Sequence, residues 1–287
     1  MFKKKLEVKA DPNKLSMSST IDLYLKALTI PASDSHKGQN GKLLIIGGSE
    51  LFHAASKWSL DVASRFVDMV FYSSVAENNE LVSQELYREA KGNFWNGIVL
   101  PREKIHEYAA EADVILIGPG MERTKETATF TDELVIAYPD KKWVIDAGAL
   151  QMIHPTLIPR TAILTPHHQE FSRLIERGFD LNSAVKNGVT VVLKGEEDSI
   201  FHASFPGDFQ MKIEGGNAGM TKGGTGDVLA GLIAGLYATN AAITSAVVGS
   251  FINKRAGDSL YEKVGPYFNA SDLVQEVPKV LWECVKP

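Results

Sequence analysis

The stretch with the clearest capacity for chemistry covers residues 216–227, where five glycines lie within twelve residues. It runs directly into an apolar segment in which Val228, Leu229, Leu232 and Ile233 repeat at helical spacing. A glycine-rich turn that opens a helix directs several backbone N–H groups at one point, and the helix dipole adds positive potential there. The segment therefore predicts a binding site for a phosphate group.

Asp227 stands where this predicted helix begins, and two interpretations of it are open. Aspartate is a preferred N-cap, which would give the residue a purely structural use. A carboxylate beside a phosphate-sized anion site is also where a base for a hydroxyl nucleophile belongs. The residue taken alone does not decide between the two.

The elements that must hold these residues are short apolar runs that alternate with helical segments. Continuous apolar runs are typical of parallel strands buried on both faces. Strands are predicted over residues 43–46, 67–71, 114–117, 143–145, 162–164 and 191–193. Helices are predicted over residues 54–65, 125–138, 170–177, 241–260 and 271–281, the last with Ser271 as its N-cap. This alternation indicates an α/β fold, with helices on both faces of a mostly parallel central sheet.

Two other regions break the alternation. Residues 199–202 and 209–213 alternate in polarity around Pro206-Gly207-Asp208, which predicts a late antiparallel hairpin. Residues 1–35 are polar and weakly periodic, with a short helix expected over 21–28. We expect a leader segment over residues 1–35 that packs on one domain formed by residues 36–287.

The bulk composition excludes several classes of protein. The chain has 287 residues, 44% of them hydrophobic, and a formal net charge of −5, which argues against a nucleic-acid-binding surface. Cys284 is the one cysteine, so no disulfide framework is possible. The basic N-terminus is not followed by an apolar run, and no window approaches the roughly 20 apolar residues that span a bilayer. We expect a cytoplasmic protein with no membrane partner.

Polar or glycine-rich residues directly follow the predicted strands. In an open parallel sheet, ligands bind just beyond the carboxyl ends of the strands. Each of these residues alone is compatible with a turn, a cap or a structural histidine. Together with the 223–227 loop they predict one site along this edge of the sheet. They are Gly47-Gly48-Ser49, Gly118-Pro119-Gly120, Asp146, His167 and Lys194.

The chain lacks two common nucleotide motifs, the P-loop and the GxGxxG turn after a first strand. The phosphates of a bound nucleotide must therefore lie against residues 223–227, with Lys194 neutralising them or lining the base pocket. A solvated strand end is the alternative for Lys194-Gly195. No histidine or cysteine spacing predicts a protein-built metal site, and Mg²⁺ carried by a nucleotide needs few protein ligands.

Taken together, these segments resemble the ADP/ATP-dependent NAD(P)H-hydrate dehydratases, the carbohydrate-kinase-like branch of the ribokinase superfamily. The resemblance runs from about residue 36 to about residue 282 and implies a ribokinase-like three-layer sandwich. The motifs that carry it, in the family's order, are His36-Lys37-Gly38-Gln39-Asn40-Gly41, Ile46-Gly47-Gly48-Ser49, Ile117-Gly118-Pro119-Gly120, Asp146-Ala147-Gly148-Ala149-Leu150, Leu164-Thr165-Pro166-His167 with Glu170-Phe171, Val192-Leu193-Lys194-Gly195, and residues 216–227.

The resemblance implies a repair reaction. The S-epimer of NADH or NADPH hydrate, which carries a hydroxyl on its nicotinamide ring, is phosphorylated from ADP or ATP. Phosphate then leaves, NADH or NADPH is restored, and AMP or ADP is the second product. Hydroxide is a poor leaving group and phosphate a good one, which gives the phosphorylation its purpose. Mg²⁺ is expected to accompany the nucleotide.

The resemblance also implies roles for single residues. Ala54, Gly118, Gly120, His167 and Asp227 would hold the hydrate, with Asp227 as the base. The adenine nucleotide would be bound by Lys194, Gly195, Glu196, Glu197, Asp198, Gly224, Thr225 and Gly226. The chain departs from the family with His53 in place of a glycine and with His168-Gln169 in place of Pro-Gly. It also has three acidic residues, 196–198, beside the expected polyphosphate.

Two further hypotheses use the same residues. A small-alcohol kinase of the superfamily would use Asp227 and the same anion site but release a stable phosphorylated product. A non-catalytic relative would bind a nucleotide without turnover. The family also assembles as homo-oligomers, often homotetramers. Many relatives carry an N-terminal epimerase domain, for which the residues before His36 are too few, so we expect the epimerase to be a separate protein.

Overall fold

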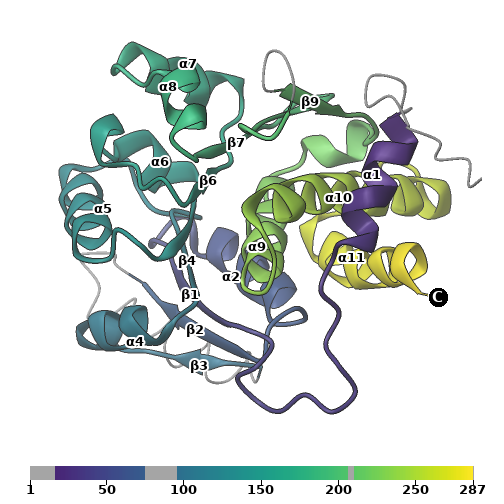
Figure 1. Ribbon diagram of the computed structural model, residues 1–287, viewed down its shortest axis with the longest axis horizontal. Helices are drawn as coiled ribbons and strands as arrows, with labels where there is room; N and C mark the ends of the chain where they lie inside the picture. Colours follow the sequence, from purple (N-terminus) through teal and green to yellow (C-terminus); the bar gives the residue numbers. More distant parts are fainter. Residues whose placement is uncertain (1–16, 75–95, 206–209, 287) are drawn as a thin grey trace, which may run out of the picture.

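A single sheet forms the centre of the molecule in the computed structural model, which describes residues 17–74, 96–205 and 210–286. Among these residues nine strands pair in the order β3-β2-β1-β4-β5-β6-β7-β8-β9 (Figure 1). The strands are β1 (Lys42–Ile46), β2 (Met69–Ser73), β3 (Ile98–Val99), β4 (Val114–Ile117), β5 (Lys142–Ile145), β6 (Ala162–Leu164), β7 (Thr190–Leu193), β8 (Asp198–Phe201) and β9 (Gln210–Ile213).

The strand order reverses at β1. The chain first winds outward through β2 and β3 and then returns to the other side of β1 as β4. All pairs from β3 to β7 are parallel, whereas β7–β8 and β8–β9 are antiparallel. The predicted mostly parallel sheet with a late antiparallel hairpin is confirmed. A reversal of this kind is where α/β sheets bind their ligands, at the carboxyl ends of the strands.

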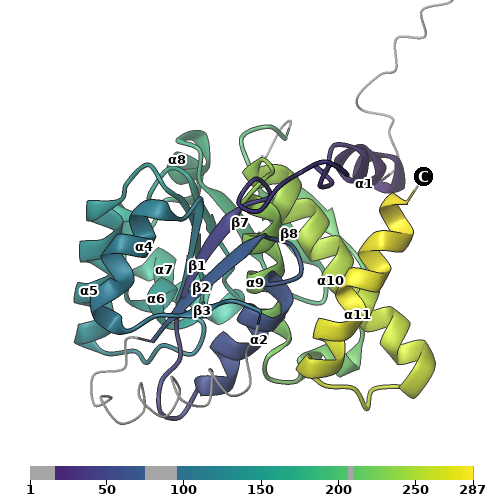
Figure 2. The same ribbon diagram turned by 90° about the horizontal axis from the view of Figure 1, so that it is seen from below.

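Helices cover both faces of the sheet and divide the core into two (Figures 1 and 2). Within β1, Leu43 and Ile45 enter one apolar cluster and Leu44 and Ile46 the other, because successive strand side chains point to opposite faces. One face carries α1 (Met17–Lys26), α2 (His53–Ala63), α9 (Thr225–Tyr237), α10 (Ala242–Val264) and α11 (Ala270–Val285). The other carries α4 (Ile105–Glu111), α5 (Lys125–Ala137), α6 (Ala147–Met152), α7 (His168–Glu176) and α8 (Leu181–Lys186).

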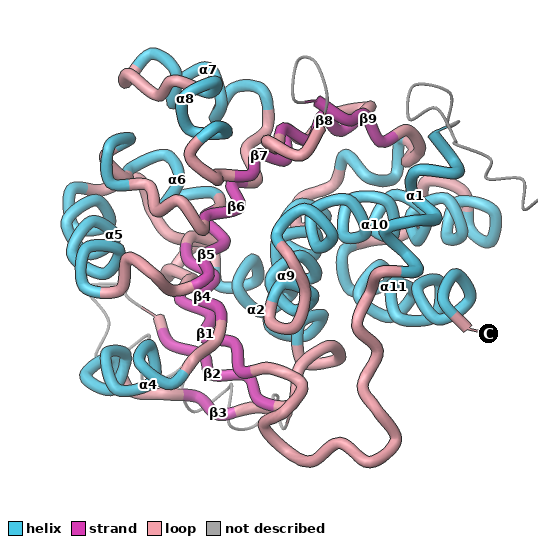
Figure 3. Tube along the Cα trace, in the orientation of Figure 1, coloured by secondary structure: helices cyan, strands magenta, loops and turns pink. Residues whose placement is uncertain are grey.

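Short 3₁₀ turns and loops complete the chain trace (Figure 3). The turns are η2 (Arg102–Lys104), η3 (Pro155–Leu157) and η4 (Ala218–Thr221). Helix α1 contacts α10 and α11 and buries Ile21 and Leu25 in the core. The boundary between leader and domain at residue 35 stays a prediction. Within the described residues, no helix is both long and apolar enough to cross a membrane.

Two predicted boundaries are wrong for identifiable reasons. The second strand begins at Met69 rather than at residue 67, because the carboxylate of Asp68 accepts hydrogen bonds from Gly38 N (2.7 Å) and Asn40 N (3.0 Å) and belongs to a loop. The last helix has Asn269 as its N-cap instead of Ser271. The Asn269 side chain accepts hydrogen bonds from the N–H groups of Ser271 and Asp272, which completes a capping box.

The helix that carries Asp227 is held against α2 by a glycine contact. A Cβ on Gly231 of α9 would lie 2.4 Å from the backbone oxygen of Ser59 in α2. The Ser59 hydroxyl in turn donates a hydrogen bond to the backbone carbonyl of Asp227 at 2.8 Å. These two contacts therefore fix the position of the first turn of α9 relative to α2.

We expect Gly231→Ala to lower the free energy of unfolding by about 1–3 kcal/mol, because the added methyl meets backbone atoms that cannot rotate away. Gly235→Ala on the same helix is the matched control. The nearest atom to its Cβ would belong to the Phe66 side chain, at 3.0 Å, and a side chain can move aside more easily than backbone. Urea unfolding of both variants measures the difference. Equal losses would contradict the proposed helix contact.

Candidate active site

Helix α9 starts in the glycine-rich loop, and close packing determines how it starts. Gly224 is the N-cap with φ of +97°, and a Cβ there would lie 2.4 Å from ring atoms of Trp58. Glycine is the residue that tolerates both constraints. Thr225, the first helical residue, donates its hydroxyl to the Met220 carbonyl at 2.7 Å. The N–H groups of a first helical turn have no partner inside the helix, so this turn is suited to bind an anion.

Asp227 is the third residue of α9 and does not cap it. The cap position belongs to Gly224, and no side chain makes a capping hydrogen bond there. The alternative that Asp227 is an N-cap is therefore wrong. Its carboxyl group lines a cavity instead.

The surroundings of Asp227 disfavour its charged form. Burial raises its pKa first, and the carboxylate of Asp146 raises it further. The ammonium of Lys194 lowers the pKa, and the Glu170 carboxylate adds a smaller increase, with a net value of about 7. A carboxyl group that titrates near neutrality is suited to accept a proton from a substrate hydroxyl.

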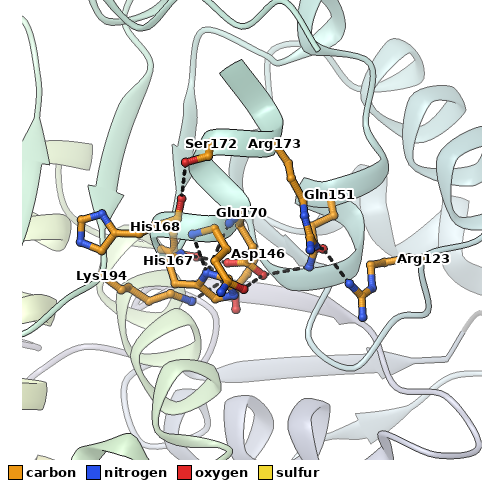
Figure 4. Close-up of polar contacts among 11 residues, drawn as sticks. Arg123, Asp146, Gln151, His167, His168, Glu170, Ser172, Arg173 and Lys194 are labelled. Carbon is orange, nitrogen blue, oxygen red and sulfur yellow. Dashed lines mark hydrogen bonds and ion pairs between the residues drawn. The ribbon is translucent and has the colours of Figure 1, made fainter. Parts of the chain in front are cut away.

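Asp146 and Lys194 form an ion pair beneath the start of α9. Lys194 Nζ lies 3.0 Å from Asp146 Oδ1 (Figure 4). The same oxygen also accepts a hydrogen bond from the Thr165 hydroxyl at 2.8 Å. Burial works against the Lys194 ammonium, but the carboxylates of Asp146, Glu170 and Asp227 together raise its pKa. A Cβ on Gly226 would lie 3.3 Å from Lys194 Nζ, so this cation directly adjoins the anion-binding turn.

His167 caps α7 through its ring. Its Nδ1 accepts hydrogen bonds from Gln169 N (3.1 Å) and Glu170 N (3.3 Å), and the backbone N–H of His167 donates to Glu170 Oε2 at 2.9 Å. Because Nδ1 accepts, the proton of the neutral ring belongs on Nε2. His167 lines the same cavity as Asp227, and its side chain is 49% exposed. Its Nε2 lies 3.7 Å from Glu170 Oε1, so this nitrogen is at the edge of the cavity beside a carboxylate.

The glycines after β4 bring backbone segments close together. A Cβ on Gly118 would lie 1.8 Å from the Asp146 carbonyl oxygen, and one on Gly120 would lie 2.2 Å from the Phe52 carbonyl oxygen. Both have positive φ. Gly120 lines the cavity, whereas Gly118 does not. Ala54 does not line it either, although Phe52 and Ala55 on each side of it do.

Two cavities lie on either side of the first turn of α9. The Asp227 cavity, of about 510 Å³, is lined by Asp227, His167 and Gly120 among others. The loop cavity, of about 560 Å³, is lined by Thr225, Gly226 and the segment that begins at Lys194. Both volumes fall within the range of small-molecule sites. The arrangement is suited to two ligands that exchange a group across the start of one helix.

Two of the three acidic residues in the segment 196–198 pair with lysines. Asp198 is buried, pairs with Lys254 Nζ at 3.3 Å and accepts the Gly195 N–H at 3.0 Å. Glu197 pairs with Lys212 at 2.6 Å and does not line the loop cavity. Glu196 also lines the loop cavity and forms no ion pair among the described residues, so one of the three carboxyl groups stays unpaired beside the expected anion.

Lys254 on α10 ties both walls of the loop cavity together. Its Nζ donates to the carbonyl oxygens of Gly195 (3.0 Å), Glu196 (2.9 Å) and Gly215 (3.2 Å). Gly195 and Glu196 belong to the loop after β7, and Gly215 to the loop after β9. A buried ammonium therefore fixes the distance between these two loops.

Sequence reasoning missed several residues that line the two cavities. They are Lys254 and Asn253 in the loop cavity, and Arg123, Gln151 and Arg173 in the Asp227 cavity. The sequence held one local indication that Arg123 lines the site, because this residue closely follows the Gly118-Pro119-Gly120 turn. Lys254 is a charged residue inside a long apolar helix, which is a second such signal.

We expect Lys254→Met to lower the free energy of unfolding by about 3–5 kcal/mol, because it leaves the buried Asp198 carboxylate unpaired. Lys212→Met, which breaks an exposed pair with Glu197, is the control and should cost at most about 1 kcal/mol. The double variant with Asp198→Asn should recover much of the Lys254→Met loss. Urea unfolding measures all three, and similar losses for the two single variants would contradict the assignment.

Comparison with known proteins supports a single family. A family model described as NAD(P)H-hydrate dehydratase matches residues 43–279. A bifunctional NAD(P)H-hydrate repair enzyme of Methanocaldococcus jannaschii is 41% identical over 263 residues, which cover 90% of this chain and 51% of that protein. An ADP-dependent (S)-NAD(P)H-hydrate dehydratase of Nitrosopumilus maritimus is 32% identical over 288 residues, covering 91% and 96%. The chain spans about half the length of the first curated relatives it matches.

Solved structures confirm the ribokinase-like fold. A ribokinase-like superfamily protein of Enterococcus faecalis superposes with a TM-score of 0.76 and 26% identity, covering 93% of this chain and 95% of the other. An ADP/ATP-dependent NAD(P)H-hydrate dehydratase of Bacillus subtilis, co-crystallized with ATP/Mg²⁺, gives 0.71 and 21%, covering 92% and 97%. Since the family model extends over most of its length, this chain belongs to the NAD(P)H-hydrate dehydratase family.

Proposed function

We propose that this protein restores NADH and NADPH from the S-epimers of their hydrates, at the expense of ADP or ATP. The observation that carries the proposal is Asp227, a half-buried carboxyl group with a pKa raised to about 7 that lines one of the two ligand-sized cavities beside the first turn of α9. Relatives that match nearly end to end are named ADP-dependent (S)-NAD(P)H-hydrate dehydratases, which favours ADP as the donor.

The chemistry follows in two steps. Asp227 takes the proton of the ring hydroxyl, and the hydroxyl oxygen attacks the terminal phosphoryl group, so that AMP leaves from ADP, or ADP from ATP. The N–H groups at the start of α9 stabilise the charge on the transferring group. The lone pair of the ring nitrogen then expels phosphate from the adjacent carbon. Loss of a proton from the next ring carbon restores the dihydronicotinamide.

We assign the hydrate to the Asp227 cavity and the nucleotide to the loop cavity. Gly120, His167 and Asp227 contact the hydrate, while Ala54 and Gly118 shape its walls through backbone packing. The nucleotide lies against Lys194, Gly195, Glu196, Asp198, Gly224, Thr225 and Gly226. For Glu197, which pairs with Lys212, we assign contact through its backbone.

A Mg²⁺ ion fits this assignment as a companion of the nucleotide. Among residues 17–74, 96–205 and 210–286, no group of three His, Cys, Asp or Glu side chains is placed to hold a metal. We therefore assign its ligands mainly to phosphate oxygens; when bound, the ion offsets their charge. A cytoplasmic location, a homo-oligomeric and specifically homotetrameric assembly, and an epimerase on a separate protein stay predictions.

The decisive experiment incubates the protein with NADH hydrate and either ADP or ATP and follows the return of reduced-nicotinamide absorbance. We expect recovery, and a loss of about 10²–10⁴-fold in rate for Asp227→Asn, because the general base is removed. Asp61→Asn, which removes a surface partner of Lys57, is the control and should keep full activity.

Other outcomes would contradict the proposal in distinct ways. Phosphorylation of another alcohol without recovery of NADH would identify a small-alcohol kinase. Nucleotide binding without any turnover would identify a non-catalytic relative.

The pH profile provides an independent test. Asp227 acts in its ionised form, and its pKa is raised, so activity is lost as pH falls through the raised value. We expect kcat/KM for the hydrate to fall about tenfold per pH unit below about pH 7. Glu170→Gln removes a nearby like charge and should shift this limb to lower pH. A wild-type limb near pH 4, the range of an ordinary carboxyl group, would contradict the assignment.

A further inference from the structure

Two arginines converge on one amide group in the Asp227 cavity. Arg123 Nη1 lies 3.4 Å and Arg173 Nη1 lies 3.2 Å from the same Gln151 Oε1 (Figure 4). The three residues come from the loop after β4, from α6 and from α7, and all of them line the cavity. Neither the established family membership nor the reaction chemistry uses this cluster.

Within the described residues the arginine pair makes no direct ion pair, although the acidic residue Glu122 also lines the cavity. In the described part of the chain, no carboxylate forms an ion pair with Arg123 or Arg173, whereas other lysines and arginines do pair. Gln151 Oε1 is neutral, and Gln151 Nε2 is held by Glu170 Oε1 at 3.0 Å. Two guanidinium groups that share one neutral acceptor repel each other until an anion lies between them.

Groups of opposite charge line different parts of the Asp227 cavity. Asp227 is half-buried and has carboxylate neighbours, whereas both arginines are exposed. A ligand with a neutral reacting ring and an anionic tail therefore lies with the ring at Asp227 and the tail at the arginine pair. The hydrated nicotinamide ring is neutral, and the dinucleotide that carries it has a pyrophosphate.

We propose that Arg123 and Arg173 bind the pyrophosphate of the hydrated dinucleotide, with Gln151 as the positioning residue whose Oε1 holds both guanidinium groups at one point of the cavity. This inference rests on the proposed function, because it names the recognition of that substrate. Guanidinium groups form bidentate, charge-assisted hydrogen bonds with phosphate oxygens. Because NADH and NADPH hydrates share the pyrophosphate, the pair contributes equally to both.

Binding of the product, without turnover, tests the proposal. Calorimetry is carried out with NADH, NADPH, ADP and reduced nicotinamide riboside, which has no phosphate. We expect Arg123→Ala and Arg173→Ala each to weaken NADH and NADPH binding by about tenfold, and to leave ADP and the riboside unchanged. The wild-type affinity for NADH should fall with added salt, and this dependence should weaken in the double variant. Arg160→Ala, which removes an exposed arginine paired with Asp140, is the control.

The other outcomes overturn the proposal. A loss confined to NADPH would assign the arginines to its 2′-phosphate, and a loss confined to ADP would assign them to the nucleotide. Unchanged affinities would remove any role for them in anion binding. In turnover, the arginine variants should raise KM for the hydrate without changing kcat, and equal effects on both would point to a structural role.

The failure of this inference is distinguishable from that of the proposed function. Arginine-dependent NADH binding with no dehydratase activity would support the anion site and contradict the proposed reaction. Full dehydratase activity with unchanged KM in the arginine variants would support the reaction and contradict the anion site. Both side chains are exposed, so we expect the variants to fold, and unchanged thermal unfolding checks this.

Discussion

The candidate site depends on an imbalance of buried charge. The carboxylates of Asp146, Glu170 and Asp227 surround the ammonium of Lys194. Asp146 takes the direct ion pair, and Glu170 accepts hydrogen bonds from the His167 N–H and the Gln151 amide. Burial raises the pKa of Asp227 most, and repulsion from the carboxylates of Asp146 and Glu170 raises it further. The strand ends thus set the proton affinity of a residue that belongs to a helix.

A second buried lysine solves the corresponding problem in the loop cavity. Asp198 and the carbonyl oxygens of the two loops form a negative surface that by itself would repel polyphosphate. Lys254 fills the centre of this surface from α10 and binds all of these groups at once. An acidic loop is therefore compatible with anion binding when its carboxylate is already satisfied. The cost of burying each ion is offset only because both partners are present.

The sequence was sufficient to predict the alternation of strands and helices and the parallel sheet, because most parallel strands are continuous apolar runs. It also predicted the late hairpin, because the two segments of the hairpin alternate in polarity around a turn. It did not predict that Asp227 lies in the third position of α9, since Gly224 takes the cap through its positive φ and its contact with Trp58. Lys254, Arg123 and Arg173 were missed because their partners lie on other elements, far along the chain or across the sheet edge. Local periodicity encodes an element but not which polar side chains meet in a cavity.

The geometry of one helical turn explains why the two cavities remain distinct. Consecutive helical residues are rotated by about 100° around the axis, so neighbours in sequence face different sides. Gly226 accordingly lines the loop cavity and Asp227 the other one. The anion-binding N–H groups lie between them, where a group that passes from one cavity to the other must cross. The hydrogen bond of Ser59 and the close approach at Gly231 hold α9 against α2 and so position this boundary.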